Sequence, residues 1–170
     1  GTAVALKDKI TIVGFLGEDV LGRRENIFNI DQKVNAKYQG FKDFQVVMVL
    51  PDGTQKQVEE LLKLDIQKLG THKGWNFVFA STDEIQAFYN QLQLKGKLND
   101  KLGTSNVFIV DKERNLRGRK GKNKKGEPEY KEGYNSISAA DLHNEMGDDI
   151  KIILAEYRLA LKKNSADRKK

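Results

Sequence analysis

Short apolar runs alternate with helix-type patterns along the first half of this chain, and this alternation constrains the fold more than any other feature. The run FQVVMVL at 44–50 is nearly all apolar, which is typical of a strand covered on both faces of a sheet. Residues 10–16 and 75–80 form similar runs, and apolar side chains at helical spacing follow each run, within 25–38, 54–69 and 82–92. Strands separated by helices pair in parallel through right-handed crossovers. This part of the sequence therefore predicts an α/β domain.

The second half of the chain breaks the alternation. Residues 106–119, NVFIVDKERNLRGR, indicate a strand, a polar turn and a returning strand, and a polar, glycine-rich loop follows. Ser138 and Asp141 form a capping-box-like start to a last helix, whose apolar stripe runs from Leu142 to Leu161. We therefore expect a central mixed β-sheet flanked by helices, an extended basic hairpin or loop, and a long C-terminal helix. The expected boundaries are a lead-in at 1–8, one domain at 9–162 and a polar basic tail at 163–170.

Composition excludes several kinds of chemistry. The 170 residues include no cysteine and two histidines, which rules out disulfides, thiolate metal sites and a cysteine nucleophile. We expect no metal and no cofactor. No run approaches the roughly 20 apolar residues that span a bilayer. Because the chain begins with Gly1 rather than Met, the sequence leaves open whether a signal peptide or membrane anchor precedes it.

Three stretches, ITIVGFLGEDVL, WNFVFASTDEIQAF and GTSNVFIVDKERNLRGR, together resemble the Sco/SenC branch of the thioredoxin-like proteins in order and spacing. The resemblance covers most of residues 9–160 and implies a thioredoxin-like fold. It also implies a periplasmic or mitochondrial domain, usually tethered by an N-terminal helix. Members of this branch bind copper and handle thiols during assembly of cytochrome oxidase.

The residues that carry this chemistry in the family are missing here. The family uses a cysteine pair after the first long strand and a histidine shortly before the strand that here reads NVFIVD. Cu(I) prefers thiolate and imidazole ligands, and thiol exchange requires a thiol, so the resemblance supports the fold and argues against the activity. The positions that replace the family's site are Gly17, Glu18, Asp19, Val20, Leu21 and Gly22 for the cysteine segment, and Gly103, Thr104 and Ser105 near the histidine.

The acidic turn allows a first alternative function. Glu18 and Asp19 would form an acid–base pair or part of a hard-cation site, with Thr104 and Ser105 as hydrogen-bonding groups in the same crevice. The simpler interpretation is that the acids favour the helix start near Arg23 and that the hydroxyls satisfy loop backbone groups. His72 and His143 are expected to be surface or boundary side chains.

A basic stretch allows a second alternative, and much of the net charge of +6 lies in it and in the C-terminal tail. It would bind nucleic acid, acidic polysaccharide, anionic lipid or an acidic protein, or else form a solvated, flexible hairpin. Nucleic acid is disfavoured because no aromatic side chain interrupts the cations before Tyr130. The cations are Arg114, Arg117, Arg119, Lys120, Lys122, Lys124 and Lys125.

The leading prediction is a non-catalytic binding or assembly module that keeps a thioredoxin-like scaffold outside the cytoplasm. Its partner would be an unidentified protein or an anionic ligand. The absence of both cysteines and the histidine motivates this prediction, since it removes redox and copper chemistry together.

Overall fold

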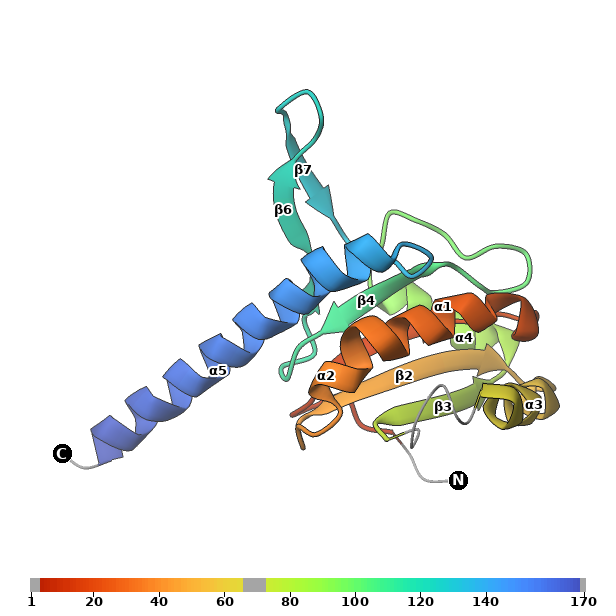
Figure 1. Cartoon of the computed structure of the whole chain (residues 1–170), viewed down its shortest axis with the longest axis horizontal. Helices are drawn as coiled ribbons and strands as arrows, with labels where there is room; N and C mark the ends of the chain where they lie inside the picture. The colour runs from red at the N-terminus through yellow and green to blue at the C-terminus, as the bar shows by residue number, and fades with distance from the viewer. Residues whose placement is uncertain (1–3, 66–72, 169–170) are drawn as a thin grey trace.

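A twisted mixed sheet forms the centre of the molecule (Figure 1). The computed structural model describes residues 4–65 and 73–168. Strand order is β3-β2-β1-β4-β5, so the first strand of the chain lies in the middle of the sheet. β1 pairs in parallel with β2, and β2 with β3, whereas β4 runs antiparallel to β1 and to β5. The strands are β1 (Ile10–Phe15), β2 (Phe44–Pro51), β3 (Trp75–Ala80), β4 (Asn106–Val110) and β5 (Leu116–Arg117).

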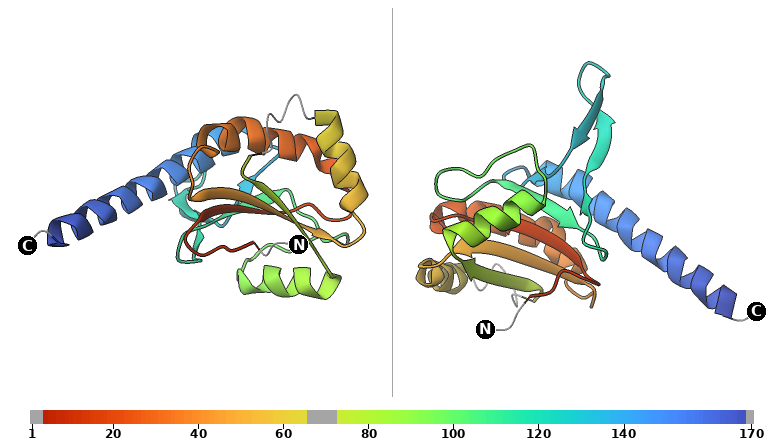
Figure 2. Two further views of the ribbon diagram at one scale, coloured as in Figure 1. Left: turned by 90° about the horizontal axis from the view of Figure 1, so that it is seen from below. Right: turned by 180° about the vertical axis from the view of Figure 1, so that it is seen from behind.

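Helices cover both faces of this sheet, as Figure 2 shows in its left view. Alternate β2 residues serve two cores: Met48 packs in the larger core with the α1, α3 and α5 side, and Val49 packs in the smaller core under α4. This two-sided burial explains why β2 reads as a nearly continuous apolar run. The helices are α1 (Arg24–Ile30), α2 (Ala36–Tyr38), α3 (Gln55–Asp65), α4 (Thr82–Gln91) and α5 (Gly147–Arg168).

The predicted helix at 25–38 is continuous from Arg24 to Tyr38 but contains a π-helical segment at Asp31–Asn35. Such segments place an extra residue in one turn, and here the turn brings the buried carboxylate of Asp31 to the indole of Trp75, at 3.0 Å. Asp31 also accepts a hydrogen bond from Asn35. The predicted helix at 54–69 is described only as far as Asp65, and His72 lies outside the described residues.

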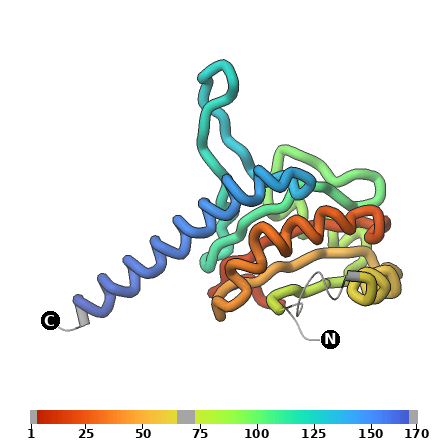
Figure 3. Tube along the Cα trace, in the orientation of Figure 1, coloured from red at the N-terminus to blue at the C-terminus, as the bar shows by residue number. Residues whose placement is uncertain are grey.

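Two elements stand away from the sheet (Figures 1 and 3). The stretch that we expected to be a loop contains a two-stranded hairpin of β6 (Arg119–Lys122) and β7 (Pro128–Lys131). β8 (Tyr134–Asn135) then returns to pair with β4. The last helix starts at the Ser138 cap, where the hydroxyl accepts the Asp141 N–H at 3.2 Å, and passes through a π-helical segment at Asp141–Met146 before α5.

The stripe expected on the last helix is buried only in part. Leu142, Met146 and Ile150 are fully buried, whereas Leu161 is 66% exposed because the helix has by then left the domain. The helix continues as far as Arg168, so most of the polar tail expected at 163–170 is helical.

The lead-in expected at 1–8 packs on the sheet from Val4 onward. Val4 and Leu6 lie against the smaller core, and the Gln45 side chain donates a hydrogen bond to the Ala5 carbonyl at 2.9 Å.

Candidate functional site: a polar crevice after strand β1

The turn that follows β1 is held in place by contacts from distant parts of the chain. Gly17 has φ = +72°, a left-handed conformation that favours glycine. A Cβ at this position would lie 2.7 Å from the Lys101 carbonyl oxygen and 2.9 Å from Gly103, so the close approach also requires glycine. The Glu18 N–H donates to that same carbonyl at 3.0 Å.

Gln57 of α3 fixes the next part of the turn. Its amide nitrogen donates to the Glu18 carbonyl at 2.9 Å, and its amide oxygen accepts the Val20 N–H at 3.1 Å. Val20 itself is fully buried. The acidic turn is therefore an ordered connection between β1 and the helices, held by one glutamine side chain.

A polar crevice of about 430 Å³ opens beside this turn, at the carboxyl end of β1. Clefts at this end of parallel strands are where α/β folds most often bind ligands. Its walls come from the turn after β1, the start of α1, and the loop before β4. The lining residues are Leu16, Asp19, Gly22, Arg23, Asn26, Asn99, Lys101, Gly103, Ser105 and Ile137.

Arg23 is the most distinctive group in this crevice. It lies in a short 3₁₀ turn at Leu21–Arg23, and its Nη1 donates to the Ser105 hydroxyl at 3.1 Å, across 82 residues of sequence. A Cβ on Gly103 would be 3.0 Å from two guanidinium nitrogens, so a glycine allows this close passage. Burial lowers the pKa of Arg23 from its usual value, while the negative charge of Asp19 raises it. The guanidinium nevertheless stays charged.

The rear wall is a hydrogen-bonded network. Asn26 donates to the Ser136 hydroxyl at 2.8 Å, and that hydroxyl donates to the Ser105 carbonyl. Asn26 and Ser136 are both buried. On the other side, the Asn99 side chain accepts the N–H groups of Lys101 and Gly103 at 3.0 and 2.9 Å. The backbone around Ser105 is thus fixed before any ligand arrives.

The structure brings some of the predicted site residues together and separates others. Asp19, Gly22 and Ser105 line the crevice. Asp19 accepts the Gly22 N–H at 3.1 Å, as expected for an acid at a helix start. Gly17 and Val20 are buried, Glu18 and Leu21 are exposed outside the crevice lining, and Thr104 accepts the Asn106 N–H at 3.2 Å within its loop.

Sequence reasoning missed the residues that give the crevice its character. Arg23 was placed only as a helix start, and Asn26, Asn99 and Lys101 were not singled out. The one available signal was position, since Arg23 follows the turn after the first strand and Lys101 precedes the loop expected at the histidine position. Of the two histidines, His143 is exposed on the last helix, as expected.

The basic stretch is divided by the structure. Arg117 and Arg119 form ion pairs with acids of α5, whereas Arg114 lies in the exposed turn between β4 and β5 with φ = +68°. The four lysines from 120 to 125 are exposed on the β6–β7 hairpin. The stretch is therefore separate from the crevice after β1.

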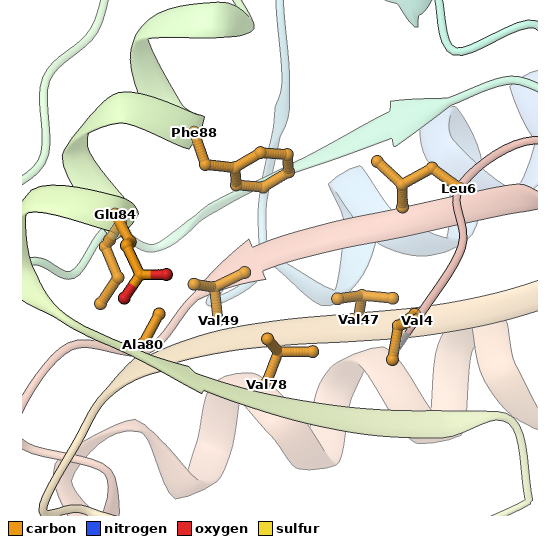
Figure 4. Close-up of a pocket in the computed structure, with 9 residues that line it drawn as sticks. Val4, Leu6, Val47, Val49, Val78, Ala80, Glu84 and Phe88 are labelled. Atoms are coloured by element: carbon orange, nitrogen blue, oxygen red, sulfur yellow. The ribbon is translucent and has the colours of Figure 1, made fainter. Parts of the chain in front are cut away.

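A second cavity, of about 270 Å³, lies on the other face of the sheet (Figure 4). Val4 and Leu6 of the lead-in, Val47 and Val78 of the strands, and Phe88 of α4 surround it. Glu84 is the one charged side chain in its lining, and its carboxylate is already used to cap α4. This cavity is an apolar packing space without convergent polar groups.

The described residues contain neither a cluster of possible metal ligands nor a membrane-spanning helix. Within residues 4–65 and 73–168, no three histidine, aspartate or glutamate side chains lie close enough together to hold a metal ion. In the same part of the chain, no helix combines the length and the apolar character needed to cross a bilayer.

Comparisons with known proteins define the fold. No protein-family model matches the chain, and no curated protein matches it significantly. Among solved structures, a putative protein disulfide isomerase from Bacteroides thetaiotaomicron superposes with a TM-score of 0.57 at 15% identity, covering 88% of this chain and 76% of the other. A SCO1/SenC family lipoprotein from Bacillus anthracis gives 0.55 at 20% identity, with 88% and 83% covered. A thioredoxin-family thiol:disulfide interchange protein from Chlorobium tepidum gives 0.54 at 20% identity, with 88% and 82% covered.

The structural neighbours thus include thioredoxin-family and Sco/SenC proteins, and the fold of this chain is thioredoxin-like. The expected fold class is confirmed, including the mixed central sheet and the long C-terminal helix. At these identities the likeness concerns the fold, and function has to be argued from the site itself.

Proposed function

We propose that this chain is a non-catalytic binding module that holds an oxyanion, either a carboxylate or a phosphate group, in the crevice after β1. The proposal keeps the thioredoxin-like scaffold and replaces thiol and copper chemistry with recognition. It depends on the site rather than on the fold, because one fold can host many activities.

The guanidinium of Arg23 carries this proposal. A guanidinium has five N–H donors in a planar fork that matches a carboxylate or phosphate. In the described part of the chain one of these donors reaches the Ser105 hydroxyl, and Asp19, whose charge acts on Arg23, accepts the Gly22 N–H through its Oδ1. A half-buried guanidinium that uses one donor among the described residues, beside a crevice of about 430 Å³, gains from an anionic ligand, since charge-assisted bidentate hydrogen bonds are strong.

Other groups support binding rather than catalysis. The chain has no cysteine, so it cannot exchange disulfides. Glu18 and Asp19, the acids of the alternative enzyme hypothesis, are both exposed. A general acid or base usually works in a water-excluded site that shifts its pKa. The exposed positions of these two acids therefore favour a module without a catalytic pair.

A location outside the cytoplasm is part of the proposal. Its support is the structural neighbour from Bacillus anthracis, which is described as a lipoprotein. A tethering segment upstream of Gly1 would fit the same location.

Titration of the isotope-labelled protein with sodium acetate and with sodium phosphate tests the oxyanion site. We expect saturable shifts of the Arg23 Nε–H and of the amides of Gly22, Gly103 and Ser105 in ¹H–¹⁵N spectra. Arg23→Gln should abolish saturation, while Arg158→Gln, which removes an exposed arginine on α5, should leave it unchanged. Sodium chloride at matched ionic strength separates specific binding from salt effects.

Two results would contradict the proposal. The first is the absence of saturable shifts with both anions in the folded wild-type protein. The second is stoichiometric Cu(I) binding in calorimetry. Such binding would show that the chain holds this metal although it has no thiolate ligand.

A further inference from the structure

Acidic side chains of the last helix neutralise the base of the β6–β7 hairpin. Arg117, next to the hairpin, forms a fork with the Glu156 carboxylate at 3.1–3.2 Å. Arg119 lies 3.6 Å from Asp149, and Lys131 lies 3.0 Å from Glu145. The Tyr134 hydroxyl also donates to Asp149, at 2.6 Å. These contacts fix the hairpin on the helix and engage the cations at its base.

The outer part of the hairpin carries lysines without the acidic partners that the cations at its base have. Four lysines, which we call the lysine tip, are all exposed, and within the described residues none lies within ion-pairing distance of an acid. Residues 119–131 hold six basic and two acidic residues, a net charge of +4. The lysine tip consists of Lys120, Lys122, Lys124 and Lys125.

The hairpin presents part of this charge on one face. Lys120 lies opposite Tyr130 and Lys122 opposite Pro128, and residues directly opposite on paired strands share a face. Tyr130 is 51% exposed on that face, although its hydroxyl end lies against Gly118, where a Cβ would collide with the phenol. The hairpin projects from the rest of the molecule (Figures 1 and 3), so its outer end is open to a partner.

We propose that the lysine tip docks on an anionic membrane surface. The four cations of the tip, which have no ion-pair partner among the described residues, are all lysines, whose compact ammonium groups act as point charges. Arginine forks, by contrast, recognise individual carboxylates or phosphates. This favours a diffuse layer of negative headgroups over a single shaped ligand. A partly exposed tyrosine beside them suits the bilayer interface, where such rings gather. The single aromatic side chain disfavours single-stranded nucleic acid, which binds through several stacked rings.

Sedimentation with vesicles tests this surface. We expect the protein to bind vesicles of phosphatidylglycerol and phosphatidylcholine at low ionic strength, and to be released in 0.5 M NaCl. Each lysine near an anionic bilayer strengthens partitioning about fivefold, so changing all four lysines of the tip to glutamine should weaken binding by roughly a hundredfold or more. Pure phosphatidylcholine vesicles should not bind.

A control variant removes the same charge elsewhere. Changing Lys7, Lys56, Lys63 and Lys97 to glutamine, all of which are exposed, should leave most of the binding intact. Circular dichroism melts of both variants establish that they fold. Equal losses in the two variants would overturn the proposal, because net charge rather than the hairpin would be responsible. Binding to heparin or duplex DNA but not to phosphatidylglycerol vesicles would also overturn it, as would failure of the folded wild type to bind any vesicle.

Discussion

At the scale of single residues, side chains fix the connections between elements. Gln57 holds the turn after β1 with two hydrogen bonds, and Ser81 begins α4 with a reciprocal capping box. In that box the Ser81 hydroxyl accepts the Glu84 N–H and the Glu84 carboxylate accepts the Ser81 N–H, both at 3.2 Å. Hydrogen bonding of the Glu84 carboxylate to Ser81 lowers the pKa of Glu84, and the Ser81 side chain contributes more than the Ser81 backbone.

Ser81→Ala tests this cap. Loss of an N-cap serine should lower the free energy of unfolding by about 1 kcal/mol at pH 7. Because the folded state lowers the pKa of Glu84, its contribution is present above the unfolded pKa of about 4.3 and is lost as the pH falls through the folded pKa. The difference between variant and wild type in urea unfolding should therefore shrink below about pH 4. A constant difference down to pH 3 would contradict the role of the carboxylate.

At the scale of elements, the hairpin and the last helix depend on each other. Arg117 contacts Asp111 of the β4–β5 turn at 3.5 Å as well as Glu156 of α5, so one guanidinium ties a strand turn to the helix. Its pKa is raised chiefly by the hydrogen bond to Glu156. Tyr157 strengthens the same junction, because its hydroxyl accepts the Lys112 N–H at 2.8 Å.

A double-mutant cycle measures the coupling across this junction. Arg117→Gln and Glu156→Gln should show an interaction energy of about 0.5–1 kcal/mol in 50 mM salt, since the pair is bidentate but partly exposed. The coupling should fall in 0.5 M salt. The same cycle with Arg158 in place of Arg117 serves as the control, and a coupling as large in the control would show that the fork is not specific.

At the scale of the whole molecule, the two ends of the described chain differ in how they pack. Val4 and Leu6 cover the apolar cavity on the α4 face (Figure 4), whereas residues 159–166 of α5 are all exposed. The first end therefore belongs to the folded core, and the second extends away from it.

Two truncations separate these contributions. Deletion of residues 1–6 should lower the free energy of unfolding by about 1–3 kcal/mol, because partly buried aliphatic contacts with the sheet are lost. Deletion of residues 163–170 should leave it within about 0.5 kcal/mol. Urea unfolding at pH 7 measures both, and equal effects would contradict this division.

Much of the fold was predictable because local patterns and tertiary packing agree. FQVVMVL predicted β2 since both of its faces are buried, and the Ser138 cap was visible within four residues of sequence. The β6–β7 hairpin was harder, because KGK and PEYK lack the apolar alternation of a strand with one buried face. Its base is instead held by ion pairs from Arg119 and Lys131 to Asp149 and Glu145 of the last helix.

The sequence predicted where the crevice lies but not which side chains line most of it. The turn after the first strand was the expected location, and Asp19, Gly22 and Ser105 do line it. The Arg23 guanidinium in this crevice donates a hydrogen bond to Ser105, which lies 82 residues away in the sequence. A local sequence pattern cannot predict a contact over that separation. Leu161 shows the opposite case. Its spacing matches the buried stripe of the last helix, but it is 66% exposed because no other described element extends far enough to cover it.

The concentration of positive charge in particular segments affects how the molecule approaches a charged object before contact. The thirteen residues at 119–131 carry a net +4, the last nine residues of the sequence carry another +4, and the remainder of the chain carries −2. A body with its positive charge concentrated in two separate segments experiences a torque in an external field, so near a negatively charged object it turns one of these segments forward during approach. Encounters would then begin through the hairpin or through the end of the last helix, and their rate would decline steeply as dissolved ions shorten the range of that torque.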